Sequence, residues 1–160
     1  MLALATYRPA QHEEMPDLSD PSSWEPTLAQ IRQQIDPHAS LHARKQRYSQ
    51  LFRDRYRSKD MAVNLRVDRE GVFYLECAAT IPTWDKARIA HQAWAEIREL
   101  FDEQPRVIIY ESYIGTFSRR VGEMRLSALS PPQPEAVFDT GWHLRRSPQQ
   151  DDFLGRLPNP

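Results

Sequence analysis

An alternating segment over residues 61–80 constrains the fold of this chain most strongly. In MAVNLRVD (61–68) apolar and polar side chains alternate, which is typical of a strand with one buried face. DREG (68–71) follows, with aspartate at the first position of a turn and glycine where a left-handed residue is wanted. VFYLECAAT (72–80) then returns with Phe73, Leu75 and Cys77 on one face and Tyr74 and Glu76 on the other. The sequence therefore predicts a β-hairpin.

The residues after the hairpin predict a helix and two further strands. Apolar side chains recur at steps of three and four between Ala87 and Phe101, after Thr83 as the expected cap. RVIIYESYI (106–114) is apolar on both faces over its first half, as a central strand is. FSRRVGEMRLSAL (117–129) is expected to be a fourth strand with Gly122 in a bulge.

The residues before the hairpin predict two helices. SSWE (22–25) offers a capping box between Ser22 and Glu25, and we expect a short helix from there to about Asp36. A second helix is expected from about Ser40 to Arg57. Together the elements predict an α+β fold in which two N-terminal helices precede a β-β-α-β-β unit. The sheet should be small, mostly antiparallel or mixed, with the helices on one side.

Proline divides the chain into a folded domain and two arms. We expect an N-terminal arm over residues 1–21, a single α+β domain over 22–129 and a proline-rich tail over 130–160. The tail carries a predicted short helix at 148–154, because Ser147 can cap it and Gly155 can end it.

Composition excludes several classes of site. The 160 residues contain 40 % hydrophobic and 27 % charged side chains, as in ordinary soluble domains. Cys77 is the single cysteine, which excludes an intramolecular disulfide and a CxxC redox pair. His38 and His42 are four apart but lack an evident third ligand, so no metal and no cofactor are predicted. Neither a signal peptide nor a membrane-length apolar run is recognisable, which predicts a cytoplasmic protein without membrane contact.

The segment HARKQRYSQLFRDRYRSK (42–59) is the main charge anomaly. Residues 41–59 hold seven Lys or Arg and one Asp, a balance of +6 in a chain whose net charge is −1. A helical projection places Arg55 inside the apolar stripe, Lys45 and Tyr56 on one border of it, and Arg53 and Arg57 on the opposite face. Nucleic-acid or anion binding through the basic 44–59 helix is therefore one hypothesis. The predicted binding residues are Lys45, Arg53 and Arg57 on this helix, together with Arg119 and Arg120.

A second hypothesis is a small enzyme that acts on an anionic metabolite. Glu111 and Glu123 would face each other if the last two predicted strands pair, with either as a base and Arg120 holding the anion. A cross-strand charge network is the commoner outcome of such a pattern, so no catalytic residue is assigned.

The favoured hypothesis is a non-enzymatic interaction or adaptor module. Its terminal arms would bind a partner protein or a second copy of the chain. Large aromatic and aliphatic groups supply much of the affinity at such surfaces. The predicted anchors are Trp24, Trp142, Phe153 and Leu154.

Overall fold

The computed structural model describes residues 25–113 and 118–139, which form an α+β fold. The described helices are α2 (Leu28–Gln33), α3 (Leu41–Arg57) and α4 (Thr83–Phe101). The described strands are β1 (Val63–Val67), β2 (Phe73–Ala78), β3 (Val107–Ser112), β4 (Ser118–Leu126) and β5 (Pro134–Phe138). The predicted fold class and the predicted order of the elements from the hairpin to the fourth strand are confirmed. The predicted anchors Trp24, Trp142, Phe153 and Leu154 lie outside the described residues.

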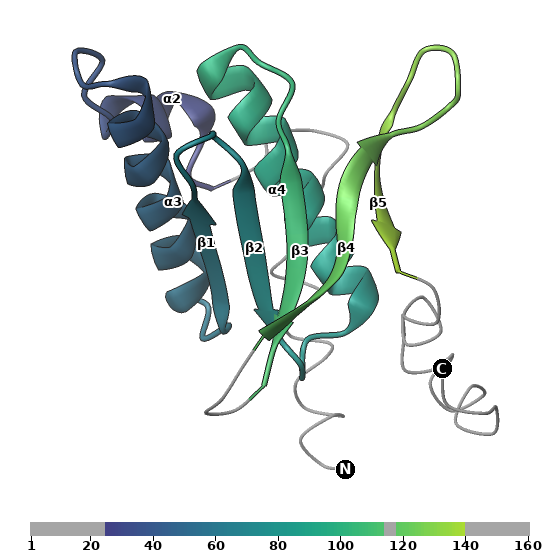
Figure 1. The fold of residues 1–160 in the computed structure, drawn as a ribbon. Coiled ribbons are helices and arrows are strands. Elements are labelled where there is room, and N and C mark those ends of the chain that lie inside the picture. Colours follow the sequence, from purple (N-terminus) through teal and green to yellow (C-terminus); the bar gives the residue numbers. More distant parts are fainter. Residues whose placement is uncertain (1–24, 114–117, 140–160) are drawn as a thin grey trace, which may run out of the picture.

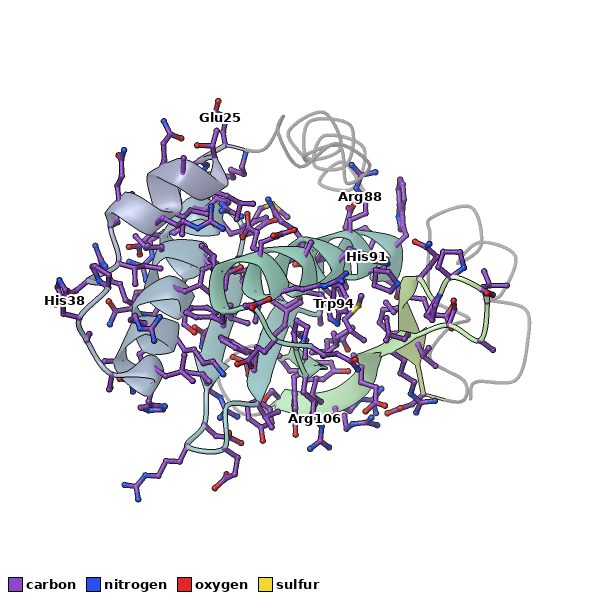
Figure 2. All side chains as sticks on the ribbon, turned by 90° about the horizontal axis from the view of Figure 1, so that it is seen from above. Glu25, His38, Arg88, His91, Trp94 and Arg106 are labelled. Atoms are coloured by element: carbon purple, nitrogen blue, oxygen red, sulfur yellow. The ribbon has the colours of Figure 1, made fainter. Side chains whose placement is uncertain are left out.

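The five strands form one mixed sheet in the order β1-β2-β3-β4-β5 (Figure 1). β2 and β3 are parallel because α4 connects them as a crossover, and the other neighbours are antiparallel. The helices lie on one side of this sheet, as the view from above shows (Figure 2). The alternation of Phe73, Leu75 and Cys77, all 0 % exposed, turns the apolar side of β2 toward them.

The hairpin turn forms as the sequence predicts. Gly71 has a φ of 88°, a conformation that favours glycine, and its amide donates to the Asp68 carbonyl. The Asp68 side chain accepts from the Val72 amide at 2.9 Å, which closes the loop. Local turn chemistry therefore fixes the register between β1 and β2.

Two helix starts differ from the sequence prediction. α2 is capped by Thr27, whose side chain accepts from Gln30 N while the Gln30 side chain bonds back to Thr27 N. α2 therefore begins at Leu28, later than predicted, whereas Ser22 of the predicted capping box lies outside the described residues. Thr83 is the first residue of α4, and Pro82 occupies the cap position without a side-chain hydrogen bond.

β5 lies in the segment that the sequence analysis assigned to the tail. It pairs with β4 at the edge of the sheet, and Pro134 begins it, a position where the absent amide hydrogen costs no ladder bond. Gly122 lets the two strands approach, because a Cβ there would lie 2.5 Å from the Val137 carbonyl oxygen. The sheet is therefore one strand larger than expected.

A buried polar network joins α3 to α4. Glu96 accepts hydrogen bonds from Tyr48 Oη at 2.7 Å and from Arg55 Nη1 and Nη2 at 3.2 and 3.0 Å. Tyr56 also bonds to Gln92. The prediction that Arg55 lies inside the buried stripe is confirmed, since it is 7 % exposed. No helix of the described part is long and apolar enough to cross a bilayer.

Candidate functional site

The side of the sheet opposite α3 and α4, here called the helix-free face, is not covered by any described element. The strand registers place two rows of side chains on it. One row runs Asn64, Glu76, Tyr110, Arg120 and the other runs Arg66, Tyr74, Ile108, Glu123. In Figure 1 the sheet is seen from this side, with α4 passing behind β3 and β4.

Tyrosines occupy the centre of the helix-free face. Tyr74 and Tyr110 are each partly exposed, and their rings meet edge to face with centroids 6.0 Å apart. The guanidinium of Arg66 lies 4.5 Å from the Tyr74 ring centroid, in cation–π contact. The Tyr74 hydroxyl donates to Asp68 at 2.8 Å, which fixes the ring from the hairpin turn. Tyr74, held by this bond, and the neighbouring Tyr110 ring therefore present polarisable surface to solvent.

An ion-pair network borders the tyrosines on β4. Glu123 accepts from Arg125 at 2.6 Å and from Arg120 at 2.8 Å, and Arg120 also bonds to Asp139 at 2.8 Å. The hydrogen bond from Arg125, with further support from Arg120, holds the pKa of Glu123 below its ordinary value. This network therefore contains positive and negative side chains, and these charges already form ion pairs with one another.

A groove of about 550 Å³, here called the corner groove, opens where the helix-free face meets α3. Its polar lining groups are Arg53, Arg57, Asp60, Asn64, Glu76 and Ser112, and residues 61–63 form one wall. Arg53 reaches around the edge strand to donate to Asn64 Oδ1 at 3.3 Å. The prediction that Arg53 and Arg57 lie outside the buried stripe of α3 is confirmed, and the structure places both in one groove.

Lys45, which the projection placed on the border of the stripe and which was a predicted member of the basic surface, is buried. It is 5 % exposed and pairs with Glu103 at 2.7 Å, while its ammonium lies 5.9 Å from the Phe73 and Phe101 ring centroids. Tyr56, placed by the projection at the border, is also buried. The exposed basic cluster of α3 is consequently smaller than the sequence suggests.

Arg119 and Arg120 do not join the Arg53–Arg57 pair. Arg120 lies on β4, three strand spacings from Asn64, which is about 14 Å. Arg119 pairs across the ladder with Glu111, and its guanidinium lies 6.0 Å from the Tyr113 ring. The five predicted basic residues therefore do not form one continuous patch.

Glu111 and Glu123 point to opposite faces of the sheet. The ladder pairs Glu111 with Arg119 and Glu123 with Ile108, so the two glutamates are not opposed. Glu111 is 4 % exposed and forms an ion pair with Lys86 at 3.0 Å, and the Tyr113 hydroxyl donates to it. The expected meeting of the two carboxylates is wrong, because a register shift between Ile109 and Tyr110 and the strand parity separate them.

Sequence reasoning did not single out Tyr74, Tyr110 or Arg66 as a surface. The alternation in MAVNLRVD and VFYLECAAT already placed Arg66 and Tyr74 on the polar side of the hairpin. What it lacked was the parallel pairing of β2 with β3, which brings Tyr110 beside them. Within the described residues no three His, Cys, Asp or Glu side chains gather as metal ligands would.

Comparisons with known proteins give no relative. No protein-family model, no curated protein and no solved structure matches the chain.

Proposed function

We propose that this chain is a non-enzymatic module that binds a partner protein, or a second copy of itself, through the helix-free face. The observation that supports it most is the pair of partly exposed tyrosines at the centre of that face, with Arg66 stacked on one of them. Tyrosine and arginine are enriched among the residues that dominate binding energy at protein interfaces. The Tyr74 ring is held before binding by its hydrogen bond to Asp68, which lowers the entropic cost of association.

The separation of the two glutamates favours binding over catalysis. A base and an anion clamp need to meet in one pocket. Glu111 is buried with Lys86 on the helix side, whereas Glu123 is paired with Arg120 and Arg125 on the helix-free face. The predicted catalytic constellation therefore does not assemble around one reacting atom.

The terminal arms would add contacts to the same partner in this proposal. A truncation that tests them must begin after β5, at residue 140, because residues 134–138 belong to the sheet. Removal of 140–160 should weaken association and leave the far-ultraviolet circular dichroism unchanged. Loss of the helix and strand signal in the circular dichroism spectrum would instead mean that the tail is needed for folding.

Site-specific photocrosslinking tests the proposed face. Benzoylphenylalanine would replace Tyr110, or Gln46 on the exposed side of α3 as the matched control, in the full chain inside cells. We expect a discrete adduct, to a partner or to a second copy, from position 110 and none from position 46, and we expect Arg66→Glu to abolish it. Equal adducts from both positions, or none from position 110, would contradict the proposal.

Nucleic acid is a second candidate partner, because Arg53 and Arg57 line the same groove. Binding through them would weaken steeply with salt and would be reduced by Arg53→Ala/Arg57→Ala. An electrophoretic mobility shift with single-stranded and duplex oligonucleotides at low salt decides this. No shift would exclude the candidate, while a shift that the double substitution leaves intact would exclude these two residues.

A further inference from the structure

The corner groove combines charges of both signs without neutralising them internally. Arg53 and Arg57 are four apart on α3, so their side chains lie on the same side of the helix. Arg57 is exposed, and its ion-pair contact with Asp54 is long, at 4.0 Å. Glu76 and Asp60 supply carboxylates to the same groove. A simple anion would meet repulsion from these carboxylates, and a simple cation would meet the two guanidinium groups.

Two side chains of the groove, Arg53 and Glu76, have hydrogen-bonding groups without a partner among the described residues. Arg53 Nε is buried from solvent and has no acceptor among the described residues. The Glu76 carboxylate, half-buried on β2, has neither a hydrogen bond nor an ion pair within residues 25–113 and 118–139. Asn64 stands between them, because it accepts from Arg53 and lies directly opposite Glu76 in the ladder. Asn64 thus separates the Arg53 guanidinium from the Glu76 carboxylate.

We propose that the corner groove binds a small zwitterion, and that an aliphatic α-amino acid is the ligand class it fits. The ligand carboxylate would accept hydrogen bonds from Arg53 and Arg57, since guanidinium groups suit carboxylates in a bidentate geometry. The ligand ammonium would donate to Glu76. The Met61–Val63 segment of the wall supplies apolar surface for a hydrocarbon side chain.

The size of the groove agrees with this ligand class. Its volume of about 550 Å³ falls within the range of small-molecule sites, roughly 300–1,000 Å³. Arg53 is partly buried and anchored by Asn64, so little side-chain entropy is lost when it binds. The groove itself is present without a protein partner, but Glu76 lies beside Tyr110 in the ladder, so a partner on the tyrosines would border the ligand.

Three matched probes separate a zwitterion site from a plain ion site. L-leucine carries both charges, 4-methylpentanoate lacks the ammonium, and 3-methylbutylamine lacks the carboxylate. Each would be titrated into the ¹⁵N-labelled full chain and followed by amide chemical shifts. We expect saturable shifts at Asn64, Glu76 and Ser112 with L-leucine, and at least tenfold weaker binding of both single-charge probes.

Substitutions then assign the contacts. Arg53→Gln should abolish the L-leucine shifts, and Glu76→Gln should remove the preference for L-leucine over 4-methylpentanoate. Arg69→Gln, an exposed arginine in the turn at the other end of β1, is the control and should change neither. Equal affinity for L-leucine and 4-methylpentanoate in the wild type would overturn the proposal. So would no saturable shift with L-leucine, or L-leucine binding that survives Arg53→Gln.

Discussion

Glu96→Gln is the substitution that probes the packing of α3 on α4 most sharply. The change keeps the side-chain volume and one carbonyl acceptor but removes the negative charge. Tyr48 and Glu96 are 0 % exposed, and the Arg55 side chain is 4 % exposed. Water therefore cannot solvate the Arg55 charge once the carboxylate is gone. Breaking one partner of such a buried pair costs about 3–5 kcal/mol, because the remaining charge is left without compensation.

That loss is large relative to the total. Domains of this size are stable by about 5–15 kcal/mol, so we expect the variant to lose about a fifth of its free energy of unfolding at the least. Urea titration followed by far-ultraviolet circular dichroism measures it, and the m-value should not change, since the native surface stays the same.

A triple substitution provides the control. Tyr48→Phe/Arg55→Met/Glu96→Leu removes all three hydrogen-bonding partners at once and keeps the volume nearly constant. We expect it to be more stable than Glu96→Gln, because none of the three replaced side chains leaves a former hydrogen-bonding partner of the other two unpaired. A loss below about 1 kcal/mol for Glu96→Gln, or a triple variant no more stable than the single one, would refute the reasoning.

Three further predictions concern the sheet. Gly122→Ala should cost about 1–3 kcal/mol in urea unfolding, because its Cβ would lie 2.5 Å from the Val137 carbonyl oxygen; an unchanged midpoint would contradict the close approach of β5. Burial raises the pKa of the Cys77 thiol to about 12, so iodoacetamide at pH 8 should label it only as fast as the protein opens; rapid labelling of the native protein would contradict its burial. The pKa of Glu123 is lowered, chiefly by Arg125, so its stabilisation is present above its unfolded pKa and is lost as pH falls through the folded pKa. Between about pH 5 and pH 3 the wild type should therefore lose slightly more stability than Glu123→Gln, by less than about 1 kcal/mol at this partly exposed site, and identical pH profiles would count against the network.

The fold was predictable from the sequence where the signal is local. The alternation over residues 61–80 and the glycine of the turn specify the hairpin, and the apolar repeat from Ala87 to Phe101 specifies α4. β5 escaped because a short edge strand that begins at proline has the composition of a tail. The close approach of β5 to Gly122 depends on the pairing of β5 with β4, which the local sequence does not indicate.

The candidate site was less predictable because it depends on pairings between distant segments. The projection of α3 separated Arg53 and Arg57 from Arg55 correctly, since helical geometry is periodic. It could not anticipate that Lys45 pairs with Glu103, which is 58 positions away in the chain. The relative facing of Glu111 and Glu123 depended on the strand register, where a shift of one residue exchanges the two faces.

Native mass spectrometry of the full chain purified from cells tests the central claim most directly. The wild type should carry an additional mass, either a partner protein or a second copy of the chain. The Tyr74→Ala/Tyr110→Ala variant should be a single chain with an unchanged circular dichroism spectrum, because both rings lie on the helix-free face and outside the core. A wild type that is a single chain, or a double variant that retains the additional mass, would contradict binding through this face.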